Sequence, residues 1–414
     1  MTNNFKRLSH PRHRTTQLFL FGFMLLALST GKLLAQPGEG KPGAPETKAA
    51  EPAEQSTSIG GYGEAVYVEP EGPTKGSIDI PRFVLFVEHT FSDDITFFSE
   101  VEVEHVRVEG ALEGGELEIE QAYLQYHLSD RLNVRAGLLV LPIGIINEYH
   151  EPPSFNGARR PMFDQVVIPT TWRELGVGIA GRIPEVEGLQ YRACLTSGLN
   201  ASGFSGAIGI SEGRLEGANP AMQSLAFSGR LEYVTGGLRA GGWLYYGGSS
   251  YGDERIADGL FGAPVTMYGL DAQYSIGDLN LRGIIGQTSI AEAGKINDTY
   301  HSTLDSLGHR IYSDPIGSAV GGGYIEAAYN IAQLLSHGTT QQLLPFVRYE
   351  RFNTNQSMPN GIEADKANDR TYVVAGLTYK PTYNTVVKVD WTMIQNATDE
   401  KVPGEFAVGV GYNF

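Results

Sequence analysis

The sequence predicts an all-β fold, a transmembrane antiparallel up-and-down β-barrel of about 16 strands. Three observations indicate it. From Thr57 onward, apolar and polar residues alternate in segments of about ten, the period of a strand with one apolar face. The connections between these segments are alternately short and long. Glycine and aromatic residues are abundant (Gly 52, Tyr 21 and Phe 18 of 414 residues), while charged residues make up only 19%.

Composition excludes several other classes. Mean hydropathy is -0.18, and the chain lacks the repeated apolar runs of roughly 20 residues that a helical membrane protein requires. The net charge of -16 argues against a nucleic-acid partner. A single Cys excludes a disulfide scaffold and a cysteine-based zinc site.

Residues 1–35 predict a secretory signal peptide. A basic start is followed by the apolar run Leu18 to Leu28, and Ala35 offers a small residue at the expected cleavage point. A retained membrane anchor is the alternative. Residues 36–56 are rich in Pro, Gly, Ala and Glu and contain no aromatic residue, so we expect a disordered periplasmic linker. Residues 57–414 then form the barrel domain.

Sixteen segments carry the strand pattern. In the last of them, Phe406, Val408 and Val410 share one face with Tyr412 and Phe414. The predicted strands are 57–68, 77–90, 94–108, 116–128, 131–141, 172–183, 188–199, 222–234, 236–248, 264–276, 277–290, 317–332, 340–353, 368–380, 383–396 and 401–414.

Two of these segments break the regular alternation. Pro81 interrupts the second segment, in which Val84 and Phe86 fall on the polar face. The fourth segment changes phase near Glu120, which predicts a β-bulge.

The alternation of short turns and long loops predicts an even-stranded sheet without a free edge. In an exported chain, this pattern is typical of an outer-membrane barrel with short periplasmic turns and long external loops. A soluble secreted sandwich or barrel is the competing interpretation. Aromatic residues near the ends of the apolar faces, such as Tyr233, Tyr268 and Tyr412, favour the membrane barrel, whose interfaces carry aromatic girdles.

Several short motifs resemble the bacterial porins of the phosphate-selective porin O/P type. They are Gly60-Gly61-Tyr62-Gly63-Glu64, Gln121-Ala122-Tyr123-Leu124-Gln125-Tyr126, Val134-Arg135-Ala136-Gly137, Pro142-Ile143-Gly144, Trp172-Arg173-Glu174-Leu175-Gly176-Val177-Gly178 and the terminal Phe414. The resemblance implies sixteen strands, a homotrimer, passive diffusion, and a third loop that folds into the pore. It also implies that Phe414 is recognised by the barrel-assembly machinery. The chain departs from anion-selective members because it has no lysine cluster, so phosphate selectivity does not transfer.

If the apolar faces meet lipid, the alternate residues line a lumen. Charged residues on the predicted strands then become pore-lining candidates: Arg82, Arg135, Arg230, Arg282, Arg348, Glu100, Glu102, Glu104 and Glu350. Because both signs are present, we expect a water-filled channel with weak selectivity for small hydrophilic solutes or ions.

The connection 142–171 is the expected constriction loop. It is the longest connection and carries five prolines, which stiffen a chain. Its charged candidates are Glu148, His150, Glu151, Arg159, Arg160 and Asp164. A solvated surface loop is the alternative.

No catalytic set, metal site or cofactor is predicted. Glu100, Glu102 and Glu104 at period two ordinarily mark a solvated face, and a calcium site is the less favoured alternative. Two other functions stay open: a barrel hydrolase, which would need a serine beside His150, and a closed structural or adhesive barrel. The expected surroundings are outer-membrane lipid and small polar solutes or ions.

Overall fold

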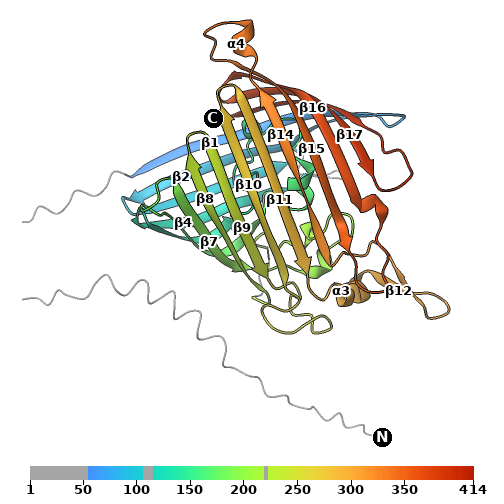
Figure 1. Cartoon of the computed structure of the whole chain (residues 1–414). Coiled ribbons are helices and arrows are strands. Elements are labelled where there is room, and N and C mark those ends of the chain that lie inside the picture. Colours follow the sequence, from blue (N-terminus) through green and yellow to red (C-terminus); the bar gives the residue numbers. More distant parts are fainter. Residues whose placement is uncertain (1–54, 106–114, 219–221) are drawn as a thin grey trace, which may run out of the picture. The chain divides into compact units, whose positions relative to one another are not determined.

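A computed structural model describes residues 55–105, 115–218 and 222–414, and over these residues the chain forms a closed barrel of sixteen strands (Figure 1). The predicted signal peptide and residues 36–54 of the predicted linker lie outside the described residues. None of the helices in the described ranges is long and apolar enough to cross a membrane.

Each barrel strand pairs antiparallel with its neighbours along the chain, and β1 closes the barrel against β18. The strands of the barrel are β1 (Ser56–Pro70), β2 (Ser77–Ser92), β3 (Ile95–Glu104), β4 (Leu117–Ser129), β5 (Leu132–Val140), β6 (Arg173–Arg182), β7 (Leu189–Ser197), β8 (Leu225–Thr235), β9 (Leu238–Gly247), β10 (Val265–Ile276), β11 (Leu279–Ile290), β14 (Ala319–Tyr329), β15 (Gln342–Ser357), β16 (Asp369–Thr382), β17 (Thr385–Asn396) and β18 (Glu405–Asn413).

The sixteen predicted segments therefore all form strands, and both irregularities have a structural basis. Pairing of β1 with β2 jumps from Glu64–Arg82 to Val66–Asp79, so Pro81 lies in an irregularity, where a strand tolerates a missing N–H. Pairing of β3 with β4 skips Glu120, which confirms the predicted bulge.

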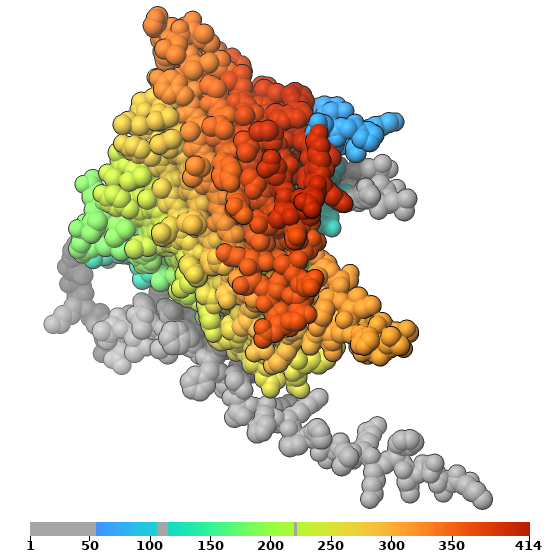
Figure 2. Space-filling model, turned by 45° about the vertical axis from the view of Figure 1, so that its right-hand side comes forward, coloured from blue at the N-terminus to red at the C-terminus, as the bar shows by residue number. Residues whose placement is uncertain are grey.

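Several connections contain structure that the periodicity did not predict. The predicted strand 317–332 ends earlier, at Tyr329, and helix α4 (Ala332–Leu335) follows it. The connection from β11 to β14 holds helix α3 (Ala293–Tyr300) and the separate hairpin of β12 (Ser302–Leu304) and β13 (Arg310–Tyr312). Figure 2 shows α4 and this hairpin projecting at opposite ends of the wall formed by β14–β17.

Along the strands, ionised residues face inward and apolar residues outward, except where inward apolar residues such as Met267 and Tyr324 join a buried cluster. On β17, Trp391 and Met393 are exposed, whereas Lys388 and Asp390 are buried. Leu281 and Ile285 on β11 are likewise exposed. The soluble-sandwich interpretation is therefore wrong, because its apolar faces would meet in a dry interior.

The chain ends where the barrel closes. Gly61 and Phe414 exchange backbone hydrogen bonds of 3.0 and 2.9 Å, which extend the β1–β18 seam. The rings of Tyr412 and Phe414 are stacked with centroids 6.4 Å apart, and both side chains are exposed. This end, which carries the shorter turns, is called the short-turn end below, and the opposite end is called the long-loop end.

Candidate functional site in the barrel lumen

The connection between β5 and β6, residues 141–172, folds into the barrel. It contains the 3-10 turn η1 (Pro152–Ser154) and the short helix α2 (Met162–Val166). Its apolar residues join a buried cluster of 30 side chains that also includes inward residues of the wall and apolar residues of the connections 198–224, 248–264 and 291–318. Phe163 on α2 packs edge-on against Tyr324 and Phe352, with ring centroids 6.3 and 6.5 Å away. The predicted constriction loop is thus placed inside the lumen.

Charged side chains of the wall bind the backbone of this loop. The donors and acceptors come from strands on several sides of the barrel. The contacts are Arg230 to the Gly144 carbonyl at 3.2 Å, Arg282 to Ser154 at 2.7 Å, Arg348 to Asn156 at 3.1 Å, Lys380 to Pro153 at 2.7 Å, the Phe163 N–H to Glu350 at 2.9 Å, and the Ala158 N–H to Asp390 at 2.6 Å. An irregular backbone segment in a barrel needs such partners, because buried N–H and C=O groups must be paired.

Two of these wall arginines are also held by carboxylates. Arg348 pairs with Glu326 at 3.0 Å and with Glu350 at 2.7 Å, and all three side chains are buried. Arg230 makes ion pairs with Glu232 at 2.9 Å and Asp271 at 2.6 Å. Each guanidinium therefore links wall carboxylates to the loop backbone.

Small residues of β18 let the loop approach the wall closely. A Cβ added at Gly411 would lie 2.4 Å from the Cβ of Pro152, and one at Gly409 would lie 3.3 Å from the Cβ of Ala158. Side chains at these positions would displace the loop. Gly144, near the start of the loop, has φ +69°, a backbone conformation that favours glycine.

The charged candidates of the loop have different roles. Glu148 pairs with Arg192 of β7 at 3.4 Å, and Arg159 forms an ion pair with Glu405 of β18. Arg160 is buried and donates to the carbonyl of His150 and the hydroxyl of Thr170, both at 3.3 Å, so it braces the loop itself. Glu151 precedes η1 and lies beside the cavity at the short-turn end.

Acidic and basic residues are separated around the lumen. The wall formed by β1–β4 carries Glu64, Glu100, Glu102, Glu104, Glu118 and Glu120, with Arg82 paired to Glu64 at 3.0 Å. The wall formed by β5–β9 carries Arg135, Arg192, Arg230 and Arg239. Arg135 donates to Gln125 at 2.8 Å and lies over the Tyr123 ring. The acidic wall of β1–β4 thus adjoins the wall of β5–β9, where the arginines lie among Glu174 and Glu232.

His150 connects the loop to the acidic wall. Its Nε2 lies 3.7 Å from Glu120 and 4.0 Å from Glu100, and all three side chains are buried. Burial lowers the pKa of an imidazole, but the Glu120 carboxylate outweighs burial here and raises the pKa of His150 to about 10. The partners of His150 in the described part of the chain include neither serine nor cysteine, so a Ser–His nucleophilic pair is not formed here.

Asp164 lies on α2, fully buried. Burial raises its pKa to about 8, and the nearby Glu350 carboxylate acts in the same direction. Near neutral pH, the Asp164 carboxyl group is therefore largely protonated inside the packed loop.

Two cavities border the loop. One of about 790 Å³ lies at the short-turn end between Tyr149, Pro153 and Ser154 of the loop and Lys380 and Tyr383 of the wall. A smaller one of about 220 Å³ lies between the loop and β4–β7, next to Arg135, Glu148 and Arg192. Both are bordered by polar groups on the side of the lumen away from the large apolar cluster.

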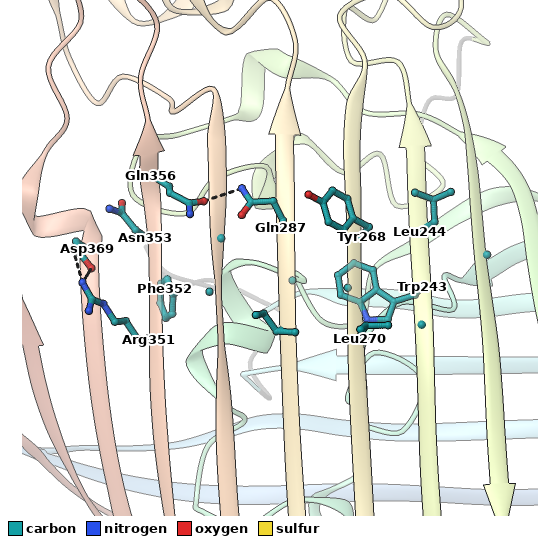
Figure 3. Close-up of a pocket in the computed structure, with 17 residues that line it drawn as sticks. Trp243, Leu244, Tyr268, Leu270, Gln287, Arg351, Phe352, Asn353, Gln356 and Asp369 are labelled. Atoms are coloured by element: carbon teal, nitrogen blue, oxygen red, sulfur yellow. Dashed lines mark hydrogen bonds and ion pairs between the residues drawn. The ribbon is translucent and has the colours of Figure 1, made fainter.

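A third cavity, about 1060 Å³, lies on the outer wall (Figure 3). Its floor includes Gly229, Gly242 and Gly321, and the exposed side chains of Tyr268 and Leu270 border it. Pairs of polar side chains stand at one end of it: Gln287 with Gln356 at 2.8 Å, and Arg351 with Asp369 at 3.2 Å. Because it opens on the outward face, this groove is separate from the lumen.

Some residues of the site were not among the sequence candidates. Asp390, Lys380 and Lys388 all face the loop, and the Lys388 ammonium lies 3.5 Å from the centroid of the Phe155 ring. The alternation of β17 already places Lys388 and Asp390 on the polar face, so the signal was present. The sequence predicted only a bulge near Glu120. Its position beside His150 could not be predicted, because the fold brings the two residues together.

The fold defines the class of protein, an outer-membrane β-barrel. Similar solved structures are OmpF of Salmonella typhi in complex with daunomycin (TM-score 0.55, 14% identity, 86% of this chain and 97% of that chain) and the outer membrane channel DcaP of Acinetobacter baumannii (TM-score 0.55, 11% identity, 87% and 97%). OmpT of Vibrio cholerae in its trimer form gives a TM-score of 0.51 at 12% identity, over 87% and 99%. At these identities the likeness concerns the fold alone.

The chain belongs to the same family as an uncharacterized protein of Aquifex aeolicus (strain VF5). The two are 31% identical over 342 residues, which span 81% of this chain and 75% of the relative. No family model matches the sequence.

We expect Arg348→Ala to loosen the loop. Removal of the guanidinium leaves Glu326 and Glu350 buried without their partner, which costs about 3–5 kcal/mol for a buried pair. Hydrogen exchange of residues 141–172 should become faster. Arg351→Ala is the matched control, because Arg351 is on the same strand but pairs with Asp369 on the outer face. Equal exchange in both variants would contradict the assigned role of Arg348.

We expect Asp164 to make stability depend on pH. Its folded pKa of about 8 lies above its ordinary value of 3.8, so the folded protein binds more protons between these values. The free energy of unfolding should therefore fall as pH rises from about 4 to about 8. Thermal unfolding of the wild type and Asp164→Asn at pH 6 and pH 9 measures this. The wild type should lose more stability than the variant, and parallel pH profiles would contradict the assignment.

Proposed function

We propose that the protein is an outer-membrane porin, a narrow water-filled channel for passive diffusion of small hydrophilic solutes or ions. The observation that carries this proposal is the arrangement of the lumen. A closed wall presents apolar residues outward and ionised residues inward, and an inserted loop narrows the interior. DcaP of Acinetobacter baumannii, which has a similar fold, is an outer membrane channel, and this supports the proposal.

The route that we propose runs between the loop and the wall of β1–β5. The apolar cluster fills the side of the lumen toward β8–β16, and three long connections contribute to it at the long-loop end. Polar groups concentrate on the other side, where Glu148, Arg135 and Arg192 border the 220 Å³ cavity. Such a route would pass small solutes only.

The separated charges support weak selectivity. Carboxylates on β1–β4 adjoin arginines on β5–β9, so a solute beside them would meet charges of both signs and not a ring of one sign. Few lysines are present, which leaves no ground for a phosphate preference. The more specific relation to the phosphate-selective porin O/P family stays a prediction.

We also propose a homotrimer in outer-membrane lipid, with export by the signal peptide and barrel assembly through Phe414. The trimer form of the similar OmpT of Vibrio cholerae supports it. Light scattering in detergent, with the detergent mass subtracted, measures the number of chains. A mass of one chain at all concentrations would contradict the trimer.

A closed structural barrel is the second candidate. Ion pairs fasten the loop to strands on different sides of the lumen: Glu148 pairs with β7 and Arg159 with β18. A loop held in this way would favour a closed lumen, in which it acts as a plug. The hydrolase alternative has less support, because His150 faces two carboxylates and a carbonyl. We propose that the protein is not an enzyme.

Single-channel recording in planar bilayers tests the proposal. The refolded wild type should give small ohmic steps, with a reversal potential close to zero in a salt gradient. Arg348→Ala should give larger steps because its loop is loosened, and Arg351→Ala should match the wild type. If neither the wild type nor Arg348→Ala conducts, the barrel is closed and the porin proposal fails.

A further inference from the structure

A bulge brings two carboxylates together on the acidic wall. Pairing between β3 and β4 passes from Val101–Ile119 to Glu100–Gln121, so Glu120 has no partner in the register. Bulges re-aim side chains in this way, often next to functional sites. Glu120 thereby lies inside the barrel close to Glu100, and their exposures are 0% and 4%.

His150 of the loop completes this cluster. Its Nδ1 lies 3.0 Å from the backbone carbonyl of Asn147, and because a carbonyl can only accept, Nδ1 carries the hydrogen. Nε2 is therefore turned toward Glu120 at 3.7 Å and Glu100 at 4.0 Å. Hydrogen bonds between an imidazolium and a carboxylate are about 2.7–2.9 Å long. These gaps are too long for direct bonds.

Both carboxylates are oriented by groups outside the cluster, and Glu120 still has a free oxygen. The Tyr62 hydroxyl donates to Oε2 of Glu120 at 3.3 Å, and the Gln121 amide donates to Oε2 of Glu100 at 2.7 Å. Within the described ranges, Oε1 of Glu120 has no hydrogen-bond partner, although the residue is fully buried. A buried, unpaired carboxylate oxygen is costly and indicates a missing partner.

Neighbouring cations do not supply that partner. Arg82 pairs with Glu64 at 3.0 Å, and Arg173 pairs with Glu118 and Glu216. The wall of β1–β4 holds six inward carboxylates against these two guanidiniums. A further positive charge would compensate this excess.

We propose that Glu100, Glu120 and His150 bind one divalent transition-metal ion of the Zn²⁺ class. Their ligand atoms all lie within 4.8 Å of one another. Zn²⁺ bonds to imidazole and carboxylate of about 2.0–2.1 Å would draw these atoms together to about 3.4 Å apart. Tyr62, Gln121 and the Asn147 carbonyl supply the outer-shell hydrogen bonds that orient ligands in metal sites.

The ligand types decide which ion is bound. Imidazole favours Zn²⁺ and its neighbours, whereas Ca²⁺ takes six to eight oxygen ligands. The adjacent trio Glu102, Glu104 and Glu118 offers oxygen alone, and two of its members are half exposed. The bound ion would fasten the loop to β3 and β4, since His150 and the two glutamates come from these separate segments.

Zn²⁺ titration of untagged protein, refolded in detergent and stripped with chelator, tests the site. Calorimetry and elemental analysis should find one Zn²⁺ per chain. Both His150→Gln and Glu120→Gln should weaken binding by about tenfold or more. His337→Gln is the matched control, because His337 lies exposed in a turn at the short-turn end. Zn²⁺ should raise the thermal midpoint of the wild type and His337→Gln but not of His150→Gln.

Equal Zn²⁺ affinity in the wild type and His150→Gln would overturn the site. Binding of Ca²⁺ in place of Zn²⁺, lost in Glu102→Gln and retained in His150→Gln, would also overturn it and assign the ion to the oxygen trio. Unfolded variants are recognised by loss of the heat-dependent shift on denaturing gels. Zn²⁺ binding is measured in micelles and does not depend on conduction. The porin proposal can therefore fail while the metal-site proposal stands.

Discussion

The structure depends on one constraint, that backbone N–H and C=O groups in hydrocarbon must all be paired within the protein. A sheet meets it only when its edges join, and here the β1–β18 seam joins them, down to the bonds between Gly61 and Phe414. Closure fixes an outside and an inside, so each strand must carry apolar residues on alternate positions. The ionised residues are left to face the interior.

That interior has to satisfy a second set of polar groups, those of the inserted loop. The loop brings apolar residues that need burial and backbone groups that need partners. Wall arginines and carboxylates supply the partners, as Arg348 does for Asn156 and Glu350 for Phe163. The same charges that line the lumen therefore also hold the inserted loop in place.

The inserted loop provides the fewest partners for the carboxylates of the acidic wall, β1–β4. The bulge places the Glu120 carboxylate close to that of Glu100. His150 is the loop side chain that lies near both carboxylates. Elsewhere a buried arginine stands between two carboxylates, as Arg230 does with Glu232 and Asp271 and Arg348 with Glu326 and Glu350. This contrast distinguishes a cation-binding cluster from the ordinary ion pairs of the barrel.

The strands and their facing follow from the sequence, because period-two alternation is a local property that each segment carries by itself. Lys388 and Asp390 face inward for the same reason that Val387 and Trp391 face lipid. Contacts between the loop and the wall could not be predicted, since they join residues such as Ala158 and Asp390 that lie far apart along the chain. Helix α4 and the position of His150 beside Glu120 also needed the fold. The sequence alone determined a closed sheet with its polar face inward. Only the tertiary structure decided what fills it, because packing of a loop depends on surfaces that exist after the barrel has closed.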